Sequence, residues 1–327
     1  MEVLSQTPPA VSRRVTFHGR GGDLFGIYVV NWLFTVLTLG IYYPWAKAAV
    51  LRYLYQETEF DNSRFSFHGT GKEMFIGFIT VIAVFVGLFI AMFSFIALAE
   101  STGQPWLAGV GMLSVYGVLF VLLPFAIHGA MRYRTSRSSW RGVRFGYRGD
   151  KSTLVQKFIG GALLTVITLG IYGSWFTIDL RRYIIGHVRF GSVKFGYKGN
   201  GTEYFVLNFV GVLLSIVTLG IYLFWYMKNL FNYYVDNLTA EQEGRALSFR
   251  STATAGGYFS LVIGNFFLVV FTLGLGLAWA QVRTLNFVFN NIAIEGSLDV
   301  DAIAQTEAAY TDATGEDMVD AMDVGII

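Results

Sequence analysis

The most regularly spaced polar residues lie in four segments that each follow a short motif, TLGIY at 38–42, 168–172 and 218–222 and TLGLG at 272–276. Counted from the third residue of the motif, a glycine, positions 5, 9, 12 and 16 share one face of a helix. Position 5 is tryptophan in every copy, and many of the later positions are polar or charged. The polar residues singled out on this face are Arg52, Asp179, Arg182, Asn229, Asn232, Arg283 and Asn286.

Two kinds of chemistry fit this face. Ionisable side chains inside a membrane are costly and usually face a cavity, so on spanning helices the arginines would line a pathway for a small polar or anionic solute. On helices that lie along the membrane surface, the same arginines would meet lipid headgroups. The sequence leaves both alternatives open. Asp179 and Arg182, three residues apart, also fit a purely structural ion pair.

Patterns of known catalytic and metal sites are absent from the sequence. The chain has no cysteine, which excludes disulfides, thiolate nucleophiles and cysteine-ligated metals. GTGK at 69–72 lacks the first glycine of a phosphate loop, and Glu73 stands where that loop needs serine or threonine. His18 and His68 recur in F-H-G segments, and we expect them to be exposed strand residues. We therefore expect no enzyme activity, cofactor, metal or nucleic-acid partner. The expected partners are membrane lipids and an unknown small solute, and the oligomeric state is left open.

The composition indicates that membrane helices position these residues. The chain is 54% hydrophobic and only 14% charged, whereas soluble domains carry about 25% charged residues. Residues 74–99 and 106–127 contain no charged residue. Because about 20 such residues span the hydrocarbon core of a bilayer, we predict a polytopic membrane protein.

A repeat of about 50 residues organises the chain. Short β-like segments separate the apolar stretches, and several of them, such as HVRF-GS-VKFGY, are typical of hairpins. Each unit is predicted to be an apolar helix, the motif turn, a second helix and a β-hairpin. The predicted divisions are a polar tail (1–14), units at 15–64, 65–142 (with an extra transmembrane helix), 143–192, 193–246 and 247–298, and an acidic flexible tail (299–327).

The motif is predicted to form a helix–turn–helix corner. Its glycines would adopt the left-handed conformation that ends the first helix, and its tryptophans would anchor the second helix at the membrane interface. These residues are Gly40, Gly170, Gly220 and Gly274, and Trp45, Trp175, Trp225 and Trp279. Small and hydroxyl residues on the first helices, among them Thr38 and Thr168, predict a helix-packing seam or a face that lines a solute path.

The charge distribution predicts an orientation. Loop 100–105 has no lysine or arginine, whereas the sequence on both sides of this pair of apolar stretches is basic. The positive-inside rule therefore places this loop outside and the N-terminus and β segments in the cytoplasm, together with the acidic C-terminal tail. One arrangement makes every unit a helical hairpin with the motif near the outer surface. The alternative has one crossing per unit, with the second helix lying in the interface.

The repeated TLGIY-x-x-W, preceded by F-x-G-x-G-x-[DE]-x-F, resembles the YjgN-like bacterial inner-membrane proteins, a family of unknown function. The motif recurs as TLGIYYPW, TLGIYGSW and TLGIYLFW, and the fourth copy has Gly276 in place of tyrosine. The resemblance runs from about Val15 to Ser297. It implies a multi-pass protein of the bacterial cytoplasmic membrane, and it implies no reaction and no verified site.

The sequence thus predicts an all-α polytopic membrane protein of repeated helical hairpins, with short β-hairpins that form a small cytoplasmic β layer. The predicted function is a transporter or channel for a small polar or anionic solute. The alternative is a non-transporting membrane scaffold or a lipid-interacting envelope protein.

Overall fold

The computed structural model describes residues 13–303 and 305–306, and in this part of the chain ten helices and ten strands follow one another largely in pairs. The helices are α1 (Gly21–Leu37), α2 (Tyr43–Gln56), α3 (Gly71–Thr102), α4 (Trp106–Ser136), α5 (Lys151–Ile167), α6 (Gly173–Gly186), α7 (Gly201–Val217), α8 (Leu223–Asp236), α9 (Ala255–Phe271) and α10 (Leu277–Asn290). The strands are β1 (Val15–Phe17), β2 (Thr58–Phe60), β3 (Ser63–Phe67), β4 (Ser138–Trp140), β5 (Val143–Tyr147), β6 (Val188–Phe190), β7 (Val193–Tyr197), β8 (Leu238–Gln242), β9 (Arg245–Ser251) and β10 (Ile292–Glu295).

The strands form one antiparallel sheet of ten strands in the order of the chain, β1 to β10. Arg13, two residues before β1, bridges to Ile294 of β10, with backbone N–H···O distances of 3.0 and 2.9 Å. The sheet therefore curves round until its last strand meets the start of its first. The prediction of an all-α fold with a small β layer is wrong, because the helices are combined with a large and nearly closed sheet.

The error has a physical reason in the shortness of the strands. They run from three residues in β1 to seven in β9, and an isolated pair of strands is only marginally stable. The predicted hairpins are present, with Phe60 opposite Ser63 and Phe190 opposite Val193. The pairs that join one hairpin to the next, such as β5 with β6, connect strands that two helices separate. No pattern within a short stretch of sequence indicates that these strands pair with each other.

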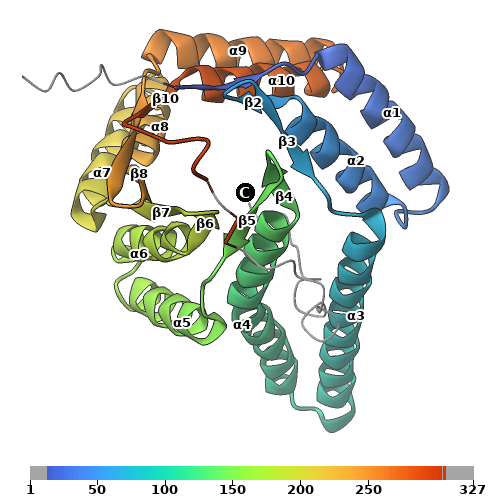
Figure 1. Ribbon diagram of the computed structural model, residues 1–327. Coiled ribbons are helices and arrows are strands. Elements are labelled where there is room, and N and C mark those ends of the chain that lie inside the picture. The colour runs from blue at the N-terminus through green and yellow to red at the C-terminus, as the bar shows by residue number, and fades with distance from the viewer. Residues whose placement is uncertain (1–12, 304, 307–327) are drawn as a thin grey trace, which may run out of the picture.

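The helix pairs stand in a ring around the sheet, with the second helix of each pair on the inner side of the ring in Figure 1. Each first helix packs between its own partner and the second helix of the preceding pair. Thus α1 contacts both α2 and α10, and α7 contacts both α6 and α8. The ring closes because the last helix lies against the first.

Tryptophans of the repeated motif hold neighbouring pairs together. Trp45 packs on the first residue of α3, Gly71, so closely that a Cβ added there would lie 2.4 Å from the indole ring. Trp175 packs on Gly201 of α7 in the same way, and Trp279 packs on Gly21 of α1. The contact between Trp279 and Gly21 joins the last pair to the first. Trp225, in the third copy of the motif, has no such contact, because the next pair begins with Ala255 and a Cβ added at Gly256 would meet nothing within 4 Å.

Tyrosines on three of the second helices, α2, α6 and α8, tie their own pairs together internally. The Tyr183 hydroxyl accepts a hydrogen bond from the Asp150 N–H and donates one to the Asp150 carbonyl, both at 2.8 Å. Tyr53 bonds Arg20 and Tyr233 bonds Asn200 in the same two ways, again 33 residues apart. Each tyrosine therefore fixes the residue that precedes the first helix of its own pair.

The interior of the curved sheet is filled by aromatic side chains and by the chain that follows β10. Val300 and Ile303 pack among Phe60, Trp140 and the inward residues of the other strands. The buried Gln242 side chain bonds the backbone of Asp299 twice, at 2.8 and 2.9 Å. In Figure 1 this segment runs into the middle of the ring. Residues 299–303, which the sequence assigned to the start of the acidic tail, thus lie against the sheet, and residues 1–12 and 307–327 lie outside the described residues.

Ring closure gives a matched test at two adjacent glycines. Replacing Gly21 by alanine pushes a methyl group into Trp279, whereas a Cβ at Gly22 meets nothing within 4 Å. We expect G21A to lower the free energy of unfolding by about 1–3 kcal/mol. G22A should be neutral or slightly stabilising, because alanine is the better helix former. Thermal unfolding of the purified protein in detergent measures both, and equal effects would contradict the assigned closure.

Candidate membrane-embedded surface

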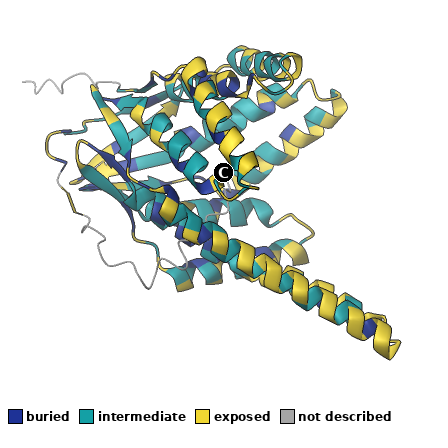
Figure 2. Cartoon of the chain, turned by 90° about the vertical axis from the view of Figure 1, so that its right-hand side faces the viewer, coloured by how far each residue is buried: buried dark blue, intermediate teal, exposed yellow. Residues whose placement is uncertain are grey.

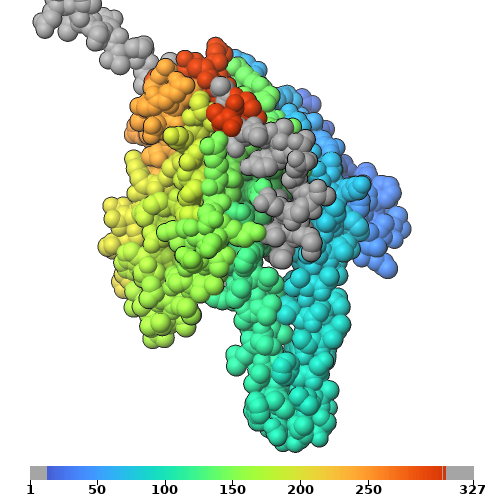
Figure 3. Space-filling view, turned by 60° about the horizontal axis from the view of Figure 1, so that its bottom comes forward, coloured from blue at the N-terminus to red at the C-terminus, as the bar shows by residue number. Residues whose placement is uncertain are grey.

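The helices carry a large apolar surface that no part of the described chain covers. Gly71–Thr102 and Trp106–Ser136 are long and apolar enough to cross a membrane, and α1, α7 and α9 are shorter apolar helices. The long pair, α3 and α4, projects from the rest of the molecule as a separate lobe (Figure 3). Exposed residues cover most of its projecting length (Figure 2). Side chains of this kind are stable only against lipid or another protein.

The four short helix pairs end in the repeated motif, whose backbone N–H groups are hydrogen-bonded within the turn or to the helix before it. In the first copy, the N–H groups of Thr38, Leu39 and Gly40 donate to carbonyls of α1 at 2.7–3.1 Å. Ile41 donates to the Thr38 carbonyl, and residue 43 to the Gly40 carbonyl, both at 3.1 Å. The remaining N–H, that of Tyr42, donates to the Thr38 hydroxyl at 3.0 Å. Every amide N–H from 38 to 43 therefore has an acceptor within the turn or the helix before it.

The threonine is the residue that completes this network. Its hydroxyl donates to the carbonyl four residues earlier while it accepts the N–H four residues later, so one side chain joins both helices. The same two bonds recur at Thr168, Thr218 and Thr272 with distances of 2.6–2.9 Å. The sequence interpretation placed these threonines in a packing seam and missed this role. Their recurrence at the first position of all four motif copies was the available signal.

A leucine occupies the apex of each turn. Leu39, Leu169, Leu219 and Leu273 are 93–94% exposed. Their φ angles of +49 to +52° lie in the left-handed region, which costs a residue with a Cβ roughly 1–2 kcal/mol. The following glycine also has positive φ, between +90 and +94°. The sequence predicted positive φ for the glycine, but the left-handed residue directly after the helix cap is the leucine. Four strained and almost fully exposed leucines would be unfavourable in water, and the same side chains are favourable in hydrocarbon.

The tip of the long pair has the opposite chemistry. Between α3 and α4 the chain reads ESTGQP, and Glu100, Ser101 and Gln104 are exposed. Gly103 ends α3 in the left-handed conformation, and the Gln104 side chain accepts a bond from the indole N–H of Trp106 at 3.1 Å. A polar tip belongs in water and an apolar tip in lipid, so the two types of tip indicate different depths.

The predicted polar face is divided among separate contacts. Arg182 bonds Asp179 at 2.9 Å and the Gly199 carbonyl, in the loop before α7, at 2.7 Å. Asn232 accepts a bond from the Ser251 hydroxyl at 2.7 Å. Both therefore join their helix to the segment that leads into the next helix pair. The proposed convergence of these side chains on one central path stays a prediction.

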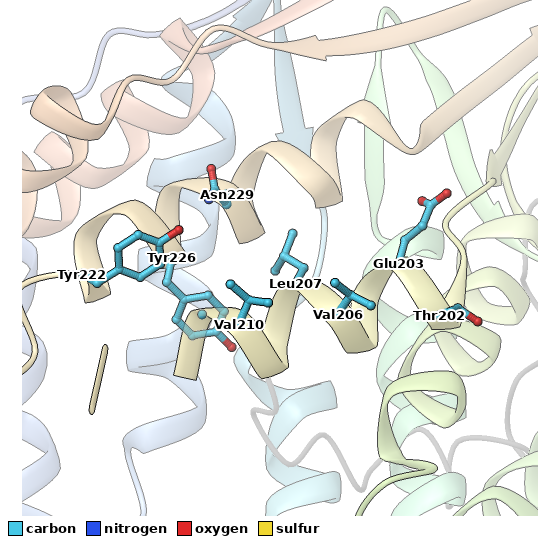
Figure 4. Close-up of a pocket in the computed structure, with 9 residues that line it drawn as sticks. Thr202, Glu203, Val206, Leu207, Val210, Tyr222, Tyr226 and Asn229 are labelled. Atoms are coloured by element: carbon cyan, nitrogen blue, oxygen red, sulfur yellow. The ribbon is translucent and has the colours of Figure 1, made fainter. Parts of the chain in front are cut away.

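The remaining members of that face lie in different surroundings. The Arg283 guanidinium rests against Gly264 of α9, Arg52 is exposed on α2, and Asn286 is half-buried on α10. Asn229 borders a cavity of about 540 Å³ between α7 and α8. Figure 4 shows that this cavity is walled mainly by apolar side chains of α7, with Asn229 above them on α8.

No group of three or more His, Asp or Glu residues that could hold a metal ion occurs in the described part of the chain. The strand residues Tyr147 and Tyr197 are buried, and this burial raises the pKa of both phenols. Both side chains therefore stay neutral at physiological pH and act as packing residues beneath Gly149 and Gly199.

The sequence matches the model of one protein family, described as bacterial proteins of unknown function (DUF898), over residues 12–198, 192–242 and 225–321. The chain belongs to this family. The chain is similar to the inner membrane protein YjgN of Salmonella typhimurium, 30% identical over 176 residues, and to that of Escherichia coli O157:H7, 39% identical over 136 residues. The resemblance to YjgN-like proteins is thereby confirmed.

The match to these relatives is partial. It covers 50% and 42% of this chain and 42% and 31% of the two relatives, so the chain spans less than half the length of the curated relatives it matches. No solved structure matches the chain. The two long apolar helices and the inner-membrane relatives together support a membrane protein.

The threonine network predicts a specific loss of stability at one motif. Thr218→Val keeps the side-chain shape but leaves the Tyr222 N–H without its acceptor, which in an apolar environment costs about 1–3 kcal/mol. Thr218→Ser keeps the hydroxyl and should be close to wild type. Thr177→Val is the matched control, because that hydroxyl only donates to the Gly173 carbonyl. Thermal unfolding in lipid nanodiscs compares the three, and equal losses for both valine variants would contradict the assigned role.

Proposed function

We propose that this protein is a non-catalytic, lipid-interacting scaffold of the bacterial inner membrane. One long hairpin, α3 and α4, crosses the bilayer. The four short hairpins enter it from the cytoplasmic side and end within the hydrocarbon layer, and the curved sheet stays in the cytoplasm. The observation that carries the proposal is the pairing of length with tip chemistry: the four short pairs end in exposed leucines and the one long pair ends in polar residues.

The hydrogen bonds of the turn support this placement. Irregular backbone exposed to lipid is normally excluded because its polar groups have no partners there. In all four copies of the TLG turn, each N–H group has an acceptor within the protein, and the threonine hydroxyl accepts the last of these bonds. A turn that ended in water would not need this network, since water supplies acceptors.

The lengths of the helices argue in the same direction. The second helices α2, α6, α8 and α10 have 14 residues each, which is about 21 Å of helix. The hydrocarbon core is about 30 Å thick. Helices of 32 and 31 residues in the long pair exceed that thickness easily. The short pairs therefore suit insertion to an intermediate depth better than complete crossing.

The second candidate function is transport of a small polar or anionic solute. The ring of helices in Figure 1 favours it, as do the polar residues of the second helices. It requires those helices to span, which their length opposes. The interior of the sheet is also filled, by Val300, Ile303 and the aromatic residues around them. Flux of a labelled solute into proteoliposomes that is lost in R52A and R182A would favour transport over the scaffold.

Single cysteines in this cysteine-free chain test the proposed depth. In intact cells a membrane-impermeant maleimide should label Ser101→Cys at the long tip. Lys194→Cys on β7 should react only after the cells are permeabilised. Leu219→Cys should escape the reagent from both sides, and a nitroxide attached there should be accessible to oxygen but not to a water-soluble nickel complex. External labelling of Leu219→Cys would show that the short hairpin crosses, and would replace the scaffold by the transport candidate.

A further inference from the structure

The outer face of three neighbouring strands, β5, β6 and β7, is basic. Phe145, Phe190 and Phe195 pack on the inner side of the sheet, so the residues that alternate with them point outward. The segments 143–149 and 188–199 contain no aspartate or glutamate. We call the outward cations of these segments the basic strip, which consists of Arg144, Arg148, Arg189, Lys194 and Lys198.

The pairing of the strands brings these charges close together. Arg189 lies directly opposite Lys194, and like charges in such positions destabilise a sheet. On the next strand, Glu241 lies opposite Lys194 and balances one of the charges. Arg148, Lys194 and Lys198 are exposed, and a cavity of about 390 Å³ is lined on one side by the two lysines. The strip therefore offers both charge and space to an anionic partner.

The last described residues of the chain lie beside this strip (Figure 1). The Arg144 N–H donates to the Gln305 side chain at 3.0 Å, and the Thr306 hydroxyl donates to the Gly191 carbonyl at 2.7 Å. Arg144 and Gly191 are each one residue beyond the paired part of β5 and β6. The Arg148 guanidinium donates to the Thr306 carbonyl at 3.4 Å. The contacts of residues 305 and 306 thus direct the following sequence to the strip.

The sequence after Thr306 has the opposite charge. Residues 307–327 lie outside the described residues, and they contain six acidic residues and no lysine or arginine. The acidic residues are Glu307, Asp312, Glu316, Asp317, Asp320 and Asp323. Three strands are about 10 Å wide and five strand residues are about 17 Å long, whereas ten extended residues reach about 33 Å. The acidic segment is therefore long enough to cross the whole strip.

We infer that residues 307–327 dock on the basic strip of their own chain, with their carboxylates on Arg148, Lys194 and Lys198. Single exposed ion pairs are weak. Because Thr306 tethers the segment beside the strip, its effective concentration there is about millimolar, as for a short linker, and several weak pairs are sufficient. The docked segment keeps other anionic surfaces away from the strip. The inference goes beyond the scaffold role and does not depend on how deeply the hairpins insert.

Zero-length crosslinking of the purified full-length protein with a water-soluble carbodiimide tests the docking. This reagent joins a lysine amine to a carboxylate only where the two are in contact. We expect crosslinks from Lys194 and Lys198 to the acidic residues of 307–327, and several-fold fewer from Lys72, an exposed lysine in the first turn of α3. Raising the salt concentration from about 0.05 M to about 0.5 M should reduce the crosslinks to the strip several-fold, because salt screens exposed charges.

A nitroxide on Ala313→Cys in the cysteine-free chain measures docking independently of the reagent. K194Q/K198Q should raise the mobile fraction of the label by roughly three- to tenfold, since two exposed ion pairs are lost. The matched control R64Q/R250Q also removes two exposed cations from the outer face of the sheet, but each of these is already paired with a glutamate. It should leave the label as immobile as in wild type.

Two results would overturn the inference directly: crosslinks that are as frequent at Lys72 as at the strip, or a label that is equally mobile in wild type and in K194Q/K198Q. Crosslinks between two chains, seen as a dimer on a denaturing gel, would assign the strip to the segment of a second copy. A label that becomes immobile only after anionic lipid is removed would show that lipid occupies the strip. Both readouts can fail while the Leu219→Cys labelling succeeds, and the reverse.

Discussion

A chain that bends inside hydrocarbon must satisfy its own amide N–H groups, because lipid offers them no acceptor. In the proposed placement this protein meets the constraint with the same three residues in each of four turns. They are a threonine whose hydroxyl joins two helices, a leucine in the left-handed conformation and a glycine that continues the turn. The strain of the leucine places an apolar side chain at the outermost point of the turn. Once such a turn is available, a helix pair can enter a membrane without crossing it.

The other features of the architecture follow because each helix pair begins and ends at the sheet. Each pair returns its chain to the sheet, where it adds two short strands that are too weak to stand alone. The strands become stable because tryptophan contacts between pairs and tyrosine bonds within pairs hold them in register, and because Trp279 on Gly21 closes the ring. Closure creates an interior, which the aromatic strand residues and the segment around Val300 fill.

The one exceptional pair combines several departures from the repeat. The α3–α4 pair lacks the turn motif and has a polar tip. It also has Phe125 and Lys151 at the positions where three other seams have tryptophan and glycine. In the proposed membrane placement these departures belong together, because a hairpin that continues to the far side of the bilayer does not need a turn suited to hydrocarbon. The contact between α4 and α5 holds a cavity of about 620 Å³ that Phe125, His128 and Arg132 help to line.

Much of the candidate surface was predictable. The family, the apolar segments 74–99 and 106–127, the left-handed glycines and the individual hairpins all follow from local residue patterns, because a turn, a helix cap or an apolar stretch is determined by neighbours in the chain. The function of Thr38 and its counterparts was not recognised, although its repetition was visible. The polar face of the second helices was correctly seen as periodic. Periodicity alone did not reveal that Arg182 and Asn232 bond the segments leading into neighbouring helix pairs.

The sequence by itself thus determined the membrane character of the chain, its repeated turn and its short hairpins, since each depends on interactions within a few residues. Only the tertiary structure decided that ten weak strands form one nearly closed sheet and that Trp279 meets Gly21 across most of the chain. These outcomes depend on contacts between residues far apart in sequence. Such contacts become stable together, when the last helix pair packs against the first. No single segment of the sequence therefore predicts that the ring closes.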